Sequence, residues 1–137
     1  MKFYPGQYVL GIGCLLGLLL GCSSSEYPSV RWEGNVTLQG KPIPSDATAE
    51  ILVVSQDAAR SSLAVKSKIE EGHYVLNQVP VGDVVVQFSI YRERPAKNKR
   101  DAERGIRDVE NLLPASFSNH LSGQASENDS QKDFDIR

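Results

Sequence analysis

Cysteine and histidine are scarce in this chain. Two cysteines and two histidines occur among 137 residues, and neither His73 nor His120 has a cysteine, a second histidine or a carboxylate at ligand spacing. Zinc sites and most nucleophilic catalytic sets require several such residues close together. The sequence also has no glycine-rich phosphate loop. We therefore expect no catalytic residues, no metal site and no cofactor, and a protein that is not an enzyme.

A long hydrophobic run is also missing. The longest apolar stretch, residues 8–20, is interrupted by glycines and is shorter than the roughly 20 residues that a transmembrane helix needs. It follows Lys2 and has the form of a cleavable export signal. The sequence thus predicts a signal peptide over residues 1–21 and an extracytoplasmic location.

This stretch ends in Leu19-Leu20-Gly21-Cys22, which three serines follow. Two aliphatic residues and a small residue before a cysteine resemble the lipobox of bacterial lipoproteins. The resemblance implies cleavage between Gly21 and Cys22, lipidation of Cys22 with diacylglycerol and often an acyl chain such as palmitate, and a lipidated tether over residues 22–29. The chain would then be held on the extracytoplasmic side of a cell-envelope membrane. The alternatives are an ordinary cleaved signal or a buried cysteine after a hydrophobic helix.

Positive charge is not in excess. The chain has 15 basic and 17 acidic side chains, and removal of residues 1–21 takes only Lys2, which leaves 14 against 17. A nucleic-acid-binding domain is normally basic overall, so we expect no nucleic-acid partner. Cys14 would leave with the signal, so no disulfide could form within the mature chain, and its stability must come from packing.

Alternation of apolar and polar residues predicts strands. Trp32, Gly34, Val36 and Leu38 alternate with polar residues, and turn signals separate this run from the next ones. Further strands are expected over residues 47–55, 63–69, 73–76 and 83–92, with turns at 39–42, 70–72 and 80–83. The spacing predicts an all-β fold, a small antiparallel β-sandwich of about seven strands over residues 30–137. In it, Tyr74 and Leu76 should face the core and His73 and Val75 should face away.

Two segments resemble carboxypeptidase-regulatory-like domains, which are transthyretin-like β-sandwiches. They are Gly34-Asn35-Val36-Thr37-Leu38-Gln39-Gly40-Lys41-Pro42-Ile43-Pro44 and Gly72-His73-Tyr74-Val75-Leu76-Asn77-Gln78-Val79-Pro80-Val81-Gly82-Asp83. Residues 111–117 and 133–137 resemble the end of small planctomycete-type lipoproteins built on this domain. Val81 departs from the pattern, which usually has a second turn glycine there. These motifs are mostly turn chemistry and core pattern, so they imply a fold and not an activity.

A charged insertion also departs from the family pattern. It carries seven basic residues: Arg92, Arg94, Lys97, Lys99, Arg100, Arg104 and Arg107. Ala102, Ile106, Val109 and Leu113 fall at helical spacing, which predicts a short amphipathic helix. Lys97, Lys99, Arg100 and Arg104 are candidate contacts to anionic lipid headgroups or an anionic polymer. The alternative is a solvated loop that caps an open end of the sandwich, and Asp101 and Glu103 favour it because they dilute the charge.

Three further features are candidate sites. His73 and His120 are interpreted as surface histidines, the first on a strand and the second in a turn. The acidic stretch from Glu127 to Asp135 has a carboxylate density similar to a calcium loop but lacks the EF-hand glycine and glutamate, so a solvated hairpin turn is expected. Tyr27, Trp32 and Tyr91 are the aromatic candidates for sugar stacking, and Trp32 falls in the apolar register.

The function expected from these features is a non-enzymatic, lipid-anchored module of the cell envelope. Its partners would be the membrane, through the lipid on Cys22, and another envelope protein or a polysaccharide. One alternative is a structural or assembly factor that acts by sheet-edge pairing. A remote alternative is an uncharacterised hydrolase.

Overall fold

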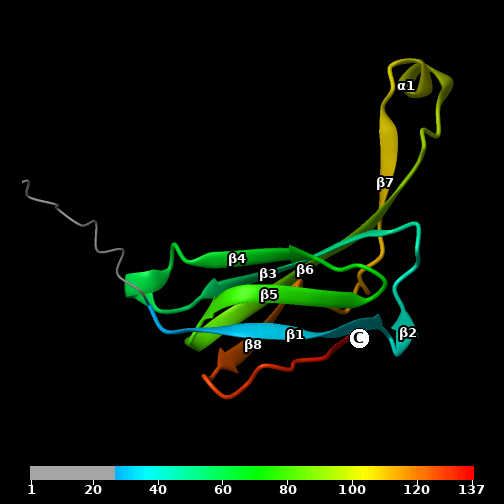
Figure 1. Cartoon of the computed structure of the whole chain (residues 1–137). Coiled ribbons are helices and arrows are strands. Elements are labelled where there is room, and N and C mark those ends of the chain that lie inside the picture. The colour runs from blue at the N-terminus through cyan, green and yellow to red at the C-terminus, as the bar shows by residue number, and fades with distance from the viewer. Residues whose placement is uncertain (1–26) are drawn as a thin grey trace, which may run out of the picture.

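Two β-sheets face each other across a shared apolar core (Figure 1). The computed structural model describes residues 27–137. The first sheet contains β1 (Ser29–Leu38), β2 (Lys41–Pro42), β5 (His73–Pro80) and β9 (Phe134–Ile136). The second contains β3 (Thr48–Ser55), β4 (Ala64–Lys68), β6 (Gly82–Pro95), β7 (Arg107–Asn111) and β8 (His120–Ala125). A 3-10 turn, η1 (Ala58–Arg60), joins β3 to β4, and a short helix, α1 (Lys99–Glu103), joins β6 to β7.

The predicted signal peptide, the Gly21–Cys22 cleavage site and most of the tether lie outside the described residues. The chain enters the fold at β1, whose first residue is paired with the last residue of β5, Ser29 with Pro80. No helix within residues 27–137 has the length and hydrophobicity to cross a membrane.

The predicted register of β1 and β5 is confirmed. Trp32 is opposite Leu76, and Gly34 is opposite Tyr74. Trp32, Leu76 and Tyr74 are buried, whereas His73 is exposed. Because side chains alternate across a strand, this register places every second residue in the core as far as Leu76. The register then shifts before Val79, which is opposite Val30.

Two predicted turns have the backbone that a two-residue hairpin requires. Gln39 and Gly40 both have positive φ, 51° and 73°, and so do Glu71 and Gly72, 52° and 82°. Positive φ at both central residues matches the right-handed twist of the flanking strands, and glycine adopts it without a Cβ clash. These turns set the pairing of β1 with β2 and the start of β5.

The C-terminal segment runs along β1 and closes the first sheet. β9 pairs with β1 in parallel, and Ile136 is fully buried. The Tyr74 hydroxyl donates to the Lys132 carbonyl at 2.6 Å, and the Asn35 N–H donates to Asp133 Oδ1 at 2.7 Å. The same approach brings the Lys132 ammonium 5.2 Å from the centre of the Trp32 ring, a favourable cation–π distance.

The acidic side chains of this segment serve as hydrogen-bond acceptors within the fold. Asp135 accepts from Arg137, from the Gly40 N–H at 2.7 Å and from the Thr37 hydroxyl at 2.8 Å. These bonds, Arg137 first, lower the pKa of Asp135 from 3.8 to about 2. Burial, with the nearby Asp133 charge second, raises the pKa of Tyr74, which keeps its hydroxyl a donor.

Several expectations about the fold need correction. The described chain has nine strands where about seven were expected, and the β1–β9 pairing is parallel in an otherwise antiparallel structure. His120 is the first residue of β8, not part of a turn. The helix is confined to Lys99–Glu103, and Val109 lies on β7, so the helical spacing from Ala102 to Leu113 was misleading.

The insertion does not cap the sandwich. Residues 92–111 form a hairpin that extends past the two sheets and carries α1 at its far end (Figure 1). No residue of α1 is buried. We call this hairpin, residues 92–111, the arm.

A methyl group at Gly34 should destabilise the fold. A Cβ built there would lie 2.6 Å from the carbonyl carbon of Lys132, so Gly34→Ala has to push the C-terminal segment away from β1. We expect a loss of about 1–3 kcal/mol in the free energy of unfolding, measured by urea denaturation. Gly123→Ala is the matched control, because a Cβ on this strand glycine meets no heavy atom within 4 Å. Equal losses from both variants would contradict the close approach.

Candidate functional site

The arm exists because β6 is longer than the strand beside it. β3 pairs with β6 only as far as Tyr91, opposite Thr48. Beyond that point, residues 92–95 pair with β7 alone, from Arg92 opposite Glu110 to Pro95 opposite Arg107. A two-stranded ribbon is marginally stable by itself, so this one depends on its continuity with the sheet and on cross-strand contacts.

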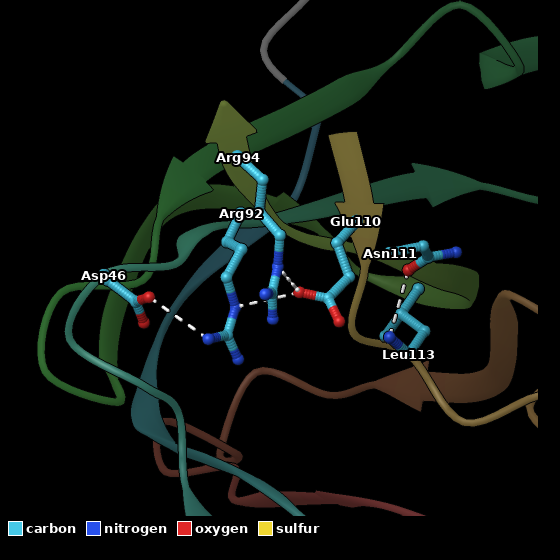
Figure 2. Close-up of polar contacts among 6 residues, drawn as sticks. All are labelled: Asp46, Arg92, Arg94, Glu110, Asn111 and Leu113. Carbon is cyan, nitrogen blue, oxygen red and sulfur yellow. Dashed lines mark hydrogen bonds and ion pairs between the residues drawn. The ribbon is translucent and has the colours of Figure 1, made fainter. Parts of the chain in front are cut away.

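Ion pairs hold the base of the arm (Figure 2). The Arg92 guanidinium reaches Asp46, in the loop before β3, at 3.2 Å, and its Nε lies 3.3 Å from Glu110, too poorly aligned for a hydrogen bond. Arg94 donates to the same Glu110 carboxylate at 2.6 Å. Near the far end, Arg107 pairs with Glu93 at 3.3 Å. The base is therefore a charge network joining β6, β7 and the β2–β3 loop.

The end of the arm is a compact turn around α1. The Asn98 side chain accepts from the Asp101 N–H at 2.8 Å, which caps the start of the helix. Gly105, with φ of 71°, reverses the chain after the helix, and the Ile106 N–H returns to the Asp101 carbonyl at 2.9 Å. We call residues 96–106 the tip.

The structure gathers the four predicted contact residues at the tip. Lys97, Lys99, Arg100 and Arg104 are all exposed, and none makes an ion pair within residues 27–137. The other three basic residues of the insertion are the paired arginines of the arm's two strands. The tip also contains Asp101, which bonds to Asn98, and Glu103. It is thus a locally cationic surface on a protein that is acidic overall.

Two apolar side chains are exposed on the arm. Ile106 is 50% exposed and Val109 is 65% exposed, and they are the large hydrophobic side chains most open to solvent in the described chain. Pro95 and Ala96 line a shallow depression beside Ile106. The tip can therefore offer apolar contact next to its charges.

A hollow of about 480 Å³ lies at the base of the arm. Along one edge of β6, pairing with β8 stops at Gln87, opposite His120, and pairing with β7 starts at Tyr91, opposite Asn111. The hollow occupies the interval between these two pairs, and Phe88, Ile90, Leu113 and Asn119 also line it. Its outward-facing walls are formed by Gln87, Ser89, Tyr91, Val109, Asn111 and His120.

The sequence did not predict this hollow. Tyr91 was a candidate for sugar stacking, and it lies in the wall, whereas Trp32 is fully buried as its register implied. Tyr27 lies outside the hollow, before β1. The position of the hollow depends on where β8 and β7 end along β6, and long-range strand pairing determines this.

The remaining candidate residues are separate from the arm. His73 and His120 are both exposed, as expected. In the acidic stretch, the Asp129 carboxylate pairs with Lys132, while Asp133 and Asp135 bond to β1 and to the turn after it. Residues 126–129 form a turn, closed by the Asp129 N–H on the Ser126 carbonyl at 3.1 Å. It is not the expected hairpin turn, because β8 and β9 belong to different sheets. Within residues 27–137, no three His, Cys, Asp or Glu side chains are grouped to hold a metal ion.

Comparison of the chain with protein-family models, with curated proteins and with solved structures finds no match.

The two groups of basic residues should differ in their effect on stability. Arg92 is partly buried and joins three segments, so Arg92→Gln should lower the free energy of unfolding by about 1 kcal/mol. Replacing Lys97, Lys99 and Arg100 together with glutamine should leave it unchanged, since these side chains are exposed and unpaired. Urea denaturation of both variants tests this, and a comparable loss from the triple variant would mean that the tip packs against the fold.

Proposed function

We propose that this protein is a lipid-anchored, non-enzymatic module of the cell envelope, with a transthyretin-like domain of the carboxypeptidase-regulatory kind. In this proposal Cys22 carries the lipid and the arm contacts another envelope component, an anionic polysaccharide or an acidic protein surface. The observation that carries the proposal is the arm itself, a hairpin that projects beyond the sandwich and ends in four unpaired cationic side chains.

The distance between the two ends of β6 supports a contact away from the anchoring membrane. β6 has 14 residues, so at about 3.3 Å per residue its ends lie about 45 Å apart. Its first residue adjoins the point where the chain enters the fold at Ser29, and its last residue leads to the tip. An upright domain would hold the tip well above the lipid surface, where a polymer or another protein is a better match than the headgroups beside Cys22.

The chemistry of the tip supports an anionic partner. A basic residue near a charged surface contributes about 1 kcal/mol, an attraction that salt screens within a Debye length of about 8 Å at physiological ionic strength. With Lys97, Lys99, Arg100 and Arg104 on one exposed turn, such contacts can be made together. Exposed Ile106 adds apolar area beside them.

The alternative of assembly by sheet-edge pairing has less support. Exposed edges that recruit strands are flat and free of inward charges. Here the protruding part of β6 carries Arg92 and Arg94 on the face that continues the core side, and edge strand β4 carries Lys66 and Lys68. The hydrolase alternative remains remote, because the sequence offers no nucleophile with an adjacent base.

Cys22→Ser should release the protein from the membrane. Several acyl chains stabilise membrane attachment at about 0.8 kcal/mol per buried methylene, and the apolar run before Cys22 is too short to replace them. After fractionation of cells in which the protein is expressed with its own leader, wild-type protein should remain in the membrane through an alkaline wash. If the Cys22→Ser protein also resists the wash, Cys22 is not the anchor.

Binding to an anionic polymer should depend on salt and on the tip. Protein beginning at Ser23 is mixed with polygalacturonate or with vesicles rich in phosphatidylglycerol, and binding is followed by co-sedimentation from low to physiological salt. We expect retention by the polymer at low salt and release as salt rises. Glutamine at positions 97, 99 and 100 should abolish most of the retention.

The control for this experiment changes the same number of charges elsewhere. Lys41, Lys66 and Lys68 are exposed and lie outside the arm, and their replacement with glutamine should leave polymer binding largely intact. Equal losses from both triple variants would indicate attraction to overall charge, and retention by vesicles but not polymer would reassign the contact to lipid.

A further inference from the structure

The hollow at the base of the arm has the hydrogen-bonding character of a neutral ligand site. Among the described residues, none that lines it is Asp, Glu, Lys or Arg. Its volume, about 480 Å³, is within the usual range for small-molecule pockets, roughly 300–1,000 Å³. Glu50 lies opposite Ser89 on the neighbouring strand, but its carboxylate is paired with Lys66 at 2.8 Å, so the free polar groups of the lining itself are uncharged.

The polar side chains of the hollow are oriented by internal hydrogen bonds and still have free donors or acceptors. Asn111 Oδ1 accepts from the Leu113 N–H at 3.0 Å, which orients the amide and leaves its Nδ2 as a free donor (Figure 2). His120 Nδ1 lies 2.8 Å from the Ser118 carbonyl. Since a carbonyl only accepts, Nδ1 donates in this contact and Nε2 is left for a ligand.

Two side chains on β6 add further hydrogen-bonding groups to the hollow. Gln87 and Ser89 are exposed on β6, and neither side chain makes a hydrogen bond within residues 27–137. A glutamine amide and a hydroxyl each donate and accept. Gln87 and Tyr91 are four residues apart on one face of β6, about 13 Å along the strand, with Ser89 midway between them. Donors and acceptors therefore alternate over the length of one or two sugar rings.

Tyr91 adds a half-buried aromatic ring at one end of this row. An aromatic ring with a polar edge suits a ligand that has both apolar C–H faces and hydroxyl groups. Val109, across from Glu93 and beside Asn111 on β7, extends the apolar side of the wall. Pyranose rings combine these two characters.

A peptide fits the hollow less well. Peptides that bind to sheet edges add a strand through backbone hydrogen bonds. The open interval on β6 spans only residues 88–90, and the Ile90 carbonyl already accepts from the Leu112 N–H at 2.9 Å. The edge is too short and too occupied for strand addition.

From these observations we infer that the hollow between β7 and β8 binds a neutral pyranose of an envelope glycan. Gln87, Ser89, Asn111 and His120 supply hydrogen bonds to the hydroxyl groups, and Tyr91 packs against a ring face. The inference goes beyond the proposed function, because it concerns a neutral ligand and a site separate from the cationic tip.

Saturation-transfer NMR with neutral trisaccharides tests the inference. The full-length protein in detergent is titrated at physiological salt with trisaccharides of glucose, galactose, mannose or N-acetylglucosamine. We expect at least one of them to bind, and Gln87→Ala to weaken that binding about five-fold or more through the loss of a hydrogen-bonding partner. Gln124→Ala is the matched control, an exposed glutamine on the same sheet outside the hollow, and it should bind as the wild type does.

The outcomes separate this site from the proposed function. No binding of any trisaccharide, or equal weakening by Gln87→Ala and Gln124→Ala, overturns the sugar site. The tip variant with glutamine at positions 97, 99 and 100 should bind the trisaccharide normally, and its failure to do so would place the ligand on the tip instead. Loss of polymer binding without loss of trisaccharide binding would keep the sugar site.

Discussion

The division of one edge of β6 between two strands determines most of what is distinctive in this molecule. β8 hydrogen-bonds to the first part of that edge and β7 to the last part, while β3 covers the opposite edge only as far as Tyr91. The interval between β8 and β7 is the hollow, and the portion past β3 is the arm. Both features are therefore fixed by the same strand, which also supplies Val84, Val86, Phe88 and Ile90 to the core.

The core itself is secured by contacts that are distant in the sequence. Phe88 on β6 meets Phe134 on β9 edge-on, with ring centres 5.3 Å apart, so the second sheet is packed against the C-terminal strand. That strand can reach β1 because Gly34 has no side chain to block Lys132. Aromatic packing across the sheets and a close backbone approach therefore depend on each other, in a domain where no disulfide is expected.

Sequence patterns predicted the parts of the fold in which local chemistry decides. The alternation around Trp32, Tyr74 and Leu76 predicted the correct faces, and the turns at Gly40 and Gly72 were placed correctly, although only the first joins two paired strands. β8 was missed because His120-Leu121-Ser122-Gly123 has little β propensity and is a strand only through its pairing with β6. Val109 and Leu113 misled the helix prediction, because Val109 lies exposed on β7, whereas Leu113 lies after that strand and packs against the core. Charge composition identified Lys97, Lys99, Arg100 and Arg104 as candidates, but their separation from the paired arginines requires three-dimensional contacts.

The arm is a hydrogen-bonded hairpin, and it differs physically from a flexible linker of the same length. A linker spanning the same distance samples many conformations, and a partner that captures its end must remove that freedom, at a cost in affinity. The arm loses its backbone freedom when the domain folds, and Arg92, Arg94 and Glu110 keep its base aligned with the sheet. Its tip is therefore held at a set distance and orientation from the core, so a partner that bound there would find its position already fixed.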